Sequence, residues 1–247
     1  MEVLYCISPV TASGKVNMEV DRRLMEISER EGRNFFRFYR WEPACISLGR
    51  GQDPEDLLDT DYMRSMGYDW VNRITGGSYV LHKGDITYSI TASSKSSMFK
   101  LPLMDFYKLV HRAFYLGILK TGIDSSMITY GNSRFAREHK KSPCFSHFSN
   151  NEILIEGRKI LGSAQKRGKN GLLQHGSLLV DDSLYDLYRI QKVFDDFDAI
   201  EKSITYIRKY ADISYEELYS HITESVCDVF GLKYLSAELK EVLENIP

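Results

Sequence analysis

Two glycine-containing basic segments constrain most strongly what this chain can fold into. Residues 73–78 read RITGGS and residues 157–165 read GRKILGSAQ, with the triplet PCF at 143–145 between them. Glycine lets the backbone approach a ligand closely because it has no side chain, and each basic residue can meet an anionic or polar head group. Cysteine is the nucleophile that needs the least assistance near neutral pH. Together these segments indicate a site that binds an acyl group and transfers it by way of a cysteine sulfur.

The overall composition is that of an ordinary globular protein, with 43% hydrophobic and 27% charged residues. The 247 residues suffice for one large domain or two small ones. A formal net charge of -2 gives no global attraction to a polyanion, so we expect no nucleic-acid partner. No stretch approaches the roughly 20 apolar residues of a membrane span, and no signal peptide is evident. We therefore expect a cytoplasmic protein without a membrane partner.

The four cysteines fall into two groups. Cys6, Cys45 and Cys227 sit in apolar runs and are expected to be small buried side chains. Cys144 lies in a polar segment, with His-Lys-Lys before it and a histidine after it. Positive neighbours favour the thiolate and lower the pKa of a thiol, although a surface-loop cysteine without a role would look similar. The spacing fits no metal motif, so we expect no metal site.

The order of predicted elements is mixed and shows no regular alternation of strands and helices. Apolar spacing predicts helices over 17–32, 54–67 and 104–121 and a helical pattern from 183 to 243. It also predicts strands over 35–39, 44–49, 70–73 and 172–180, and hairpins that join 78–82 to 85–90 and 152–156 to 159–165. Residues 131–151 are polar and loop-like. This order predicts an α/β (α+β) fold with a mixed or antiparallel sheet flanked by helices.

Several polar residues are candidates for chemistry, each with a plainer alternative. Lys159 and Arg73 lie beside glycines and can reach a ligand oxygen, but a solvated strand lysine and a plain turn are the alternatives. His82 and His175 can act as bases or orient a substrate, or can be structural histidines. Ser177 is not in a GxSxG motif, which argues against a serine hydrolase. The GxxxxGK[ST] pattern of a phosphate-binding P-loop is also absent.

Three ordered segments carry a family resemblance. Residues 73–82, 156–165 and 174–179 resemble the RRxxGGGAVxH, GRKxxGSA and HGxLL segments of the superfamily of lipoate-protein ligases, octanoyltransferases and biotin ligases. Asn72 stands where the family has its first arginine, and Ser78 where it has its third glycine. Three matches in this order are far more specific than any one of them. The likeness covers about 17–180.

The resemblance implies a fold and a set of site residues. The fold is a single catalytic domain over 1–247, like that of biotin ligases and class II synthetases, with 183–247 as a mainly helical C-terminal portion. A hydrophobic tunnel would hold a medium-length acyl chain, and Lys159 would contact its carbonyl group. No cofactor is expected. The implied substrate-binding residues are Arg73, Gly76, Gly77, His82, Gly162, Ser163, Ala164 and His175.

Within this superfamily, the sequence favours a transferase over a ligase. Cys144 lies where the Bacillus-type octanoyltransferases keep their nucleophile, and residues 85–89 lack the asparagine that is common in ligases. The resemblance therefore implies an octanoyltransferase of lipoate biosynthesis. Its donor would be octanoyl-acyl carrier protein, and its acceptor a lysine of a lipoyl domain or of the glycine-cleavage H protein. One alternative is an ATP-dependent lipoate-protein ligase that forms lipoyl-adenylate. Others are a transferase that acts from an already octanoylated H protein, and a non-catalytic module that binds lipoyl domains.

Overall fold

Three β-sheets form the framework of the computed structural model, which describes residues 1–131, 152–192 and 197–244. The largest sheet has six strands in the order β10-β11-β6-β2-β1-β12. The β2–β1 and β1–β12 pairs are parallel and the β10–β11, β11–β6 and β6–β2 pairs are antiparallel, which confirms the predicted mixed sheet. These strands are β1 (Val3–Ala12), β2 (Asn34–Trp41), β6 (Asp85–Ser93), β10 (Leu161–Arg167), β11 (Gly171–Leu179) and β12 (Lys233–Ala237).

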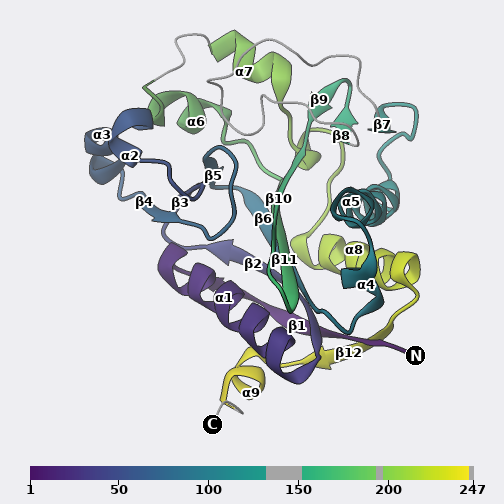
Figure 1. The fold of residues 1–247 in the computed structure, drawn as a ribbon. Coiled ribbons are helices and arrows are strands. Elements are labelled where there is room, and N and C mark those ends of the chain that lie inside the picture. The colour runs from purple at the N-terminus through teal and green to yellow at the C-terminus, as the bar shows by residue number, and fades with distance from the viewer. Residues whose placement is uncertain (132–151, 193–196, 245–247) are drawn as a thin grey trace.

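Three long helices cover the two faces of this sheet (Figure 1). Helix α1 (Gly14–Glu31) packs on one face, against β2, β6 and β11. Helices α5 (Leu103–Leu119) and α8 (Tyr215–Phe230) pack against each other over the opposite face, where the largest apolar cluster lies. The predicted arrangement of a sheet flanked by helices is therefore confirmed. Among the described residues, none of the helices combines the length and the apolar character needed to cross a membrane.

Two small sheets and several short helices complete the described structure. The strands of the small sheets are β3 (Cys45–Leu48), β4 (Asp69–Asn72) and β5 (Val80–His82), and β7 (Ile128–Gly131), β8 (Glu152–Ile155) and β9 (Arg158–Lys159). The short helices are α2 (Pro54–Leu57), α3 (Thr60–Ser65), α4 (Ser97–Lys100), α6 (Leu184–Ile190), α7 (Phe197–Ser203) and α9 (Leu239–Glu244), with one 3-10 turn at Ile207–Lys209. Helices α6 and α7 pack with β3 and β5 in a second apolar cluster.

Helix α1 shows how local sequence sets an element that later positions the site. The Ser13 side chain accepts a hydrogen bond from Val16 N at the first turn, and Gly32 ends the helix with φ 75°, as predicted. Residues one turn apart form the buried stripe that faces the sheet. That stripe is not purely apolar, since its buried members are Gly14, Asn17, Val20, Asp21, Leu24, Met25, Ile27 and Ser28.

Two predicted hairpins need correction. The chain does turn at 83–84, but β5 pairs with β3 and not with β6, because both edges of β6 are occupied by β2 and β11. The second turn is also present, at Glu156 and Gly157, which have φ of 50° and 76°. There β8 pairs with the short β9, and from Leu161 the chain enters the large sheet beside β11.

Two further predictions also fail in detail. The single helix expected over 54–67 is two short helices, because Leu58 forms a bridge with Gln191 and the Asp59 side chain caps a new helix. The helical pattern after 183 is interrupted by β12, which pairs in parallel with β1 at the edge of the large sheet. Most of β12 is exposed, so its residues carry no buried periodicity that would reveal a strand.

Gly176 in β11 is predicted to be intolerant of a side chain. An added Cβ would lie 2.5 Å from Gly162 O, 2.5 Å from Ser163 Oγ and 2.6 Å from Tyr88 Cε1. Because the first of these is backbone of the neighbouring strand, Gly176→Ala is expected to lower the free energy of unfolding by about 1–3 kcal/mol in urea denaturation. The matched control is Gly76→Ala, where nothing lies within 4 Å of the added Cβ. Equal stabilities of the two variants would contradict this packing argument.

Candidate active site

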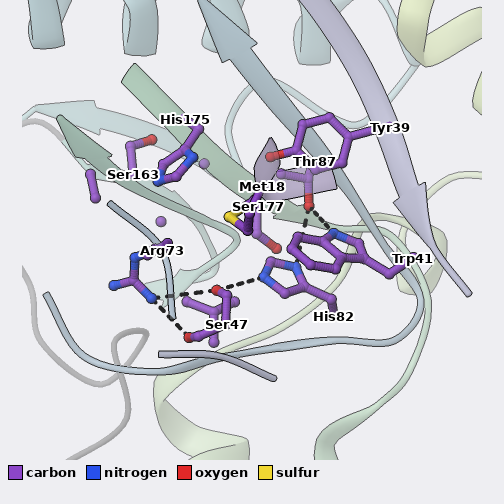
Figure 2. Close-up of a pocket in the computed structure, with 14 residues that line it drawn as sticks. Met18, Tyr39, Trp41, Ser47, Arg73, His82, Thr87, Ser163, His175 and Ser177 are labelled. Carbon is purple, nitrogen blue, oxygen red and sulfur yellow. Dashed lines mark hydrogen bonds between the residues drawn. The ribbon is translucent and has the colours of Figure 1, made fainter. Parts of the chain in front are cut away.

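A pocket opens on the α1 side of the large sheet (Figure 2). It lies where α1, the ends of β2, β3, β5 and β6, and the paired strands β10 and β11 meet. Its walls combine apolar surface with a few buried polar groups, as binding sites for small molecules commonly do. The lining residues are Met18, Tyr39, Trp41, Ser47, Arg73, Val80, His82, Thr87, Gly162, Ser163, Ala164, His175, Gly176 and Ser177.

The pocket brings together residues from all three segments that carry the family resemblance. Apart from Gly76 and Gly77, every residue predicted to bind substrate lines it. Those two glycines lie in the turn that Arg73 holds, because Arg73 Nη2 donates to Gly76 O at 2.8 Å and to Ser78 O at 2.7 Å. Its Nη1 donates to Ser47 O at 2.8 Å. Arg73 thus joins β3 to the glycine turn at the pocket wall.

The two predicted catalytic residues have different outcomes. Cys144 lies outside the described residues. Lys159 is not among the residues that line the pocket, and its amine lies 3.1 Å from Glu152 Oε1 in a buried ion pair within the β8–β9 hairpin. Glu152 is the first described residue after 132–151, the stretch that contains Cys144. Lys159 is therefore paired with the residue that directly follows, in sequence, the segment that contains the predicted nucleophile.

One histidine of the pocket is held by Asp85. His82 Nδ1 lies 2.8 Å from Asp85 Oδ2, and its Nε2 lies 2.8 Å from the Ser47 hydroxyl. The ring of Trp41 stacks on His82 with centroids 4.0 Å apart and planes inclined by 12°. The Asp85 carboxylate also accepts the Ser177 hydroxyl at 2.7 Å. Packing and hydrogen bonds therefore fix both the plane and the two nitrogens of this imidazole.

The other histidine is held by a carboxylate from α1. His175 Nδ1 lies 3.0 Å from Asp21 Oδ2, and its Nε2 lies 2.7 Å from Thr75 Oγ1. Asp21 also receives two N–H groups of Arg37 at 3.0 and 2.7 Å and the Tyr39 hydroxyl at 2.9 Å. Burial lowers the pKa of His175 and outweighs the attraction of Asp21, so the imidazole is neutral at pH 7.

The charge of Asp21 makes folding stability depend on pH. Burial raises the pKa of Asp21, but Arg37 and His175 outweigh burial and lower it from 3.8 to about 2. A depressed pKa stabilises the folded state above the unfolded-state value and loses that effect as the pH falls through the folded-state value. We expect roughly 2 kcal/mol of the free energy of unfolding to vanish between about pH 5 and about pH 1.5. Urea unfolding across this range measures it, and Asp21→Asn should flatten this part of the curve.

Ser163 connects the pocket to the opposite helical layer. Its hydroxyl lies 2.8 Å from the Tyr88 hydroxyl and 2.9 Å from His111 Nε2, which comes from α5. Gln174 donates to the Tyr88 hydroxyl at 2.9 Å. His111 is fully buried, so these contacts hold the Ser163 hydroxyl in one place at the pocket wall. Within the described ranges, no cluster of three His, Cys, Asp or Glu side chains could hold a metal ion.

Comparison with known proteins identifies the family. Residues 13–227 match the family described as the lipoyl protein ligase A/B catalytic domain. The chain belongs to this family. The octanoyltransferase LipM of Clostridioides difficile is 30% identical over 239 residues, which cover 92% of this chain and 87% of that protein. LipM of Bacillus subtilis is 33% identical over 184 residues, which cover 72% of this chain and 66% of that protein.

A solved structure of a lipoyl protein ligase shows the same fold. The putative lipoate protein ligase of Thermoplasma acidophilum with bound lipoic acid superimposes with a TM-score of 0.76 and 21% identity, covering 99% of this chain and 91% of that chain. The superfamily and the catalytic-domain fold that the sequence implied are therefore confirmed. The Bacillus-type character of the resemblance is confirmed as well, because the relatives are LipM proteins.

Several residues that hold the side chains of this site were not predicted from the sequence. Asp85 had a signal, since it follows His82 by three residues across a Lys-Gly turn. Asp21, Ser47 and His111 had none, because each reaches the site through the packing of an element distant in sequence. A carboxylate on an amphipathic helix is usually solvated, and only the buried stripe of α1 marks Asp21 as different.

Proposed function

We propose that this chain transfers an octanoyl group from octanoyl-acyl carrier protein to a lysine of a lipoyl domain or glycine-cleavage H protein, through a thioester on Cys144. The observation that carries the proposal is that the three family segments meet at one pocket, in a chain whose relatives are octanoyltransferases called LipM. The reaction would take place in the cytoplasm, with the described chain acting as one catalytic unit.

In the first step, the Cys144 thiolate attacks the carbonyl carbon of the donor thioester. The new C–S bond forms as the bond to the carrier's sulfur breaks, and the carrier leaves as a thiol after taking up a proton. One thioester replaces another, so the step is close to balanced and needs no ATP. Positive neighbours in the sequence around Cys144 support a thiolate at this position.

In the second step, the acceptor lysine attacks the octanoyl-enzyme as a neutral amine. A C–N bond forms, the C–S bond to Cys144 breaks, and the nitrogen gives up a proton to His82 or His175. The amide is more stable than the thioester, so this step draws the first one forward. Chain length would follow from the depth of the pocket, at roughly 1–3 kcal/mol for each methylene.

Charge that develops on the acyl oxygen would be met by fixed donors. Lys159 would polarise the carbonyl group in both steps, with Glu152 holding its amine. Backbone N–H groups near Gly76, Gly77 or Gly162 would stabilise the oxyanion, each at about 3 kcal/mol. The head group of the substrate would meet Arg73, which the structure holds at the pocket wall.

An assay of the acyl donor tests this proposal against the alternatives. The purified chain is mixed with a lipoyl domain and either octanoyl-acyl carrier protein without ATP, or free octanoate with ATP and magnesium. The transferase proposal predicts octanoylated lipoyl domain from the carrier alone. Product only with free acid and ATP would identify a ligase instead, and no product with either donor would indicate a non-catalytic binding module.

A further inference from the structure

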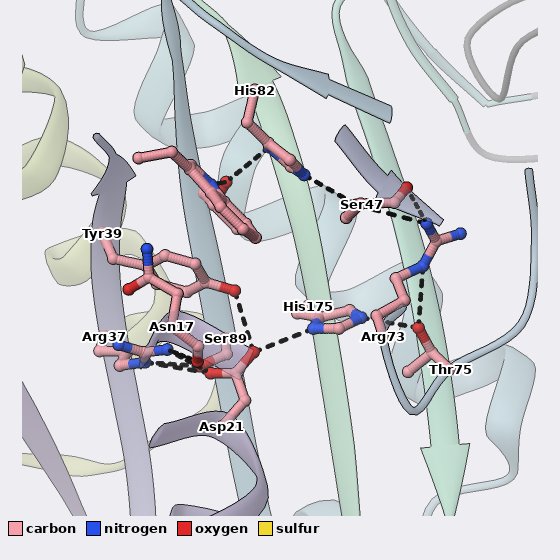
Figure 3. Close-up of polar contacts among 12 residues, drawn as sticks. Asn17, Asp21, Arg37, Tyr39, Ser47, Arg73, Thr75, His82, Ser89 and His175 are labelled. Atoms are coloured by element: carbon pink, nitrogen blue, oxygen red, sulfur yellow. Dashed lines mark hydrogen bonds and ion pairs between the residues drawn. The ribbon is translucent and has the colours of Figure 1, made fainter. Parts of the chain in front are cut away.

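Two chains of hydrogen bonds, each of the order aspartate, histidine, hydroxyl, converge on Arg73. Figure 3 shows the first chain from Asp21 to Arg73 and the second from His82 to Arg73. In the first, Asp21 binds His175 and His175 binds Thr75, whose hydroxyl oxygen receives Arg73 Nε at 3.1 Å. The second runs from Asp85 through His82 and Ser47, and Arg73 Nη1 lies 3.4 Å from the Ser47 hydroxyl. Arg73, which holds the glycine turn, thus contacts the hydroxyl groups of both Thr75 and Ser47.

The direction of each hydrogen bond in the first chain is determined by Asp21. Its carboxylate can only accept, so His175 must carry its hydrogen on Nδ1. A neutral imidazole then has a lone pair on Nε2, which accepts the hydroxyl hydrogen of Thr75. The Thr75 oxygen in turn accepts from Arg73, which can only donate. A single tautomer of His175 satisfies every group in the chain.

Asp21 acts on the pocket only through other residues. It is not among the lining residues and is 1% exposed. Its Oδ1 receives Arg37, and its Oδ2, the oxygen that faces His175, also receives the Tyr39 hydroxyl. Arg37 is likewise absent from the lining residues, and its side chain is fully buried. A buried carboxylate held by two fixed donors is suited to orienting an imidazole, since it cannot rotate away.

We propose that Asp21 is a positioning residue of this site, which holds His175 in its Nδ1–H tautomer and thereby fixes the Thr75–Arg73 contact that shapes the glycine turn. This inference rests on the proposed function only because its assay measures octanoyl transfer. The tautomer itself is measured independently of activity.

Asp21→Asn is the informative substitution. Two N–H groups of Arg37 point at Oδ1, so the amide oxygen must stay there. The amide NH₂ must then face both His175 and the Tyr39 oxygen, which becomes an acceptor. That NH₂ donates to Nδ1, which forces the imidazole hydrogen onto Nε2. An Asp-to-Asn change behind a histidine is known to leave geometry intact while selecting the wrong tautomer. The Thr75 hydroxyl then loses its acceptor, and its oxygen receives N–H groups from both His175 and Arg73.

Nitrogen-15 NMR of the imidazoles in the full chain, together with transfer assays, tests the proposal. His175 is expected to carry its hydrogen on Nδ1 in the wild type and on Nε2 in Asp21→Asn, with kcat for octanoyl transfer reduced by about 10²-fold. A second variant, Thr75→Val, removes the hydroxyl without placing an unpaired charge. Thr75→Val should keep the Nδ1–H tautomer of His175 and lose octanoyl transfer to a similar degree. The double variant Asp21→Asn/Thr75→Val should have a kcat no lower than that of the slower single variant.

The matched control is Ser28→Ala, on the same buried stripe of α1. It removes the hydrogen bond to Thr91 and leaves the Asp21 chain intact, so tautomer and transfer should match the wild type. An unchanged tautomer in Asp21→Asn, or a changed tautomer with full transfer, would overturn the proposal. If the wild type transferred no octanoyl group, the proposed function would fail instead, and the NMR spectra alone would decide whether Asp21 sets the tautomer.

Discussion

Octanoyl transfer by Cys144→Ala is expected to fall by about 10³-fold or more, because the variant has no sulfur to carry the acyl group between donor and acceptor. Transfer is measured as octanoylated lipoyl domain formed from octanoyl-acyl carrier protein. The loss should appear in kcat, because the described residues that line the pocket proposed to hold the acyl chain are unchanged in this variant.

Another cysteine provides the matched control for this result. Cys45 is buried, and burial raises the pKa of its thiol, so it stays protonated and cannot serve as a nucleophile near neutral pH. It does not line the pocket. Cys45→Ala should therefore transfer octanoyl groups at the wild-type rate. If Cys144→Ala transferred octanoyl groups at the wild-type rate while Cys45→Ala lost transfer, the reaction would not pass through residue 144.

Replacement of Lys159 by methionine is expected to have the second large effect, on stability and on rate together. The variant removes the lysine from its buried ion pair with Glu152, which should lower the free energy of unfolding by about 3–5 kcal/mol. It also removes the group proposed to polarise the acyl carbonyl. Urea denaturation measures the first effect, and transfer assays on the folded fraction measure the second.

The double variant Lys159→Met/Glu152→Gln separates these two roles. Removing both charges leaves no buried carboxylate that has lost its lysine, so most of the lost stability should return. If Lys159 contacts the acyl group, the double variant is stable yet transfers octanoyl groups at least about 10²-fold more slowly. Recovery of full transfer in the double variant would show that Lys159 serves only to neutralise Glu152.

The sequence was a good guide to the pocket and a poor guide to what supports it. Arg73, His82, Gly162 and His175 were found because each belongs to a short segment with a recognisable order of glycines and basic residues. The residues of such a segment are adjacent in sequence, so the segment can be recognised without knowledge of the fold. The mixed sheet followed in the same way from the order of the elements.

Apart from Asp85, which lies three residues from His82, the missed site residues depend on packing between distant parts of the chain. Asp21 looks like any helix-surface carboxylate until Arg37 and His175 are placed beside it. The partner of β5 was wrong because a hairpin turn and a turn between two sheets have the same residues, and only the occupied edges of β6 distinguish them. Neither kind of information is local, so periodicity and turn residues do not contain it.

The account depends most on a covalent octanoyl-enzyme, which intact-protein mass spectrometry detects directly. Wild-type chain is mixed with octanoyl-acyl carrier protein in the absence of acceptor and ATP, and the mass of the whole chain is recorded. We predict a gain of one octanoyl group that maps to the peptide containing Cys144, is absent from Cys144→Ala, and disappears when a lipoyl domain is added. Full transfer activity with no mass gain at any time, or a gain that persists in Cys144→Ala, would contradict the account.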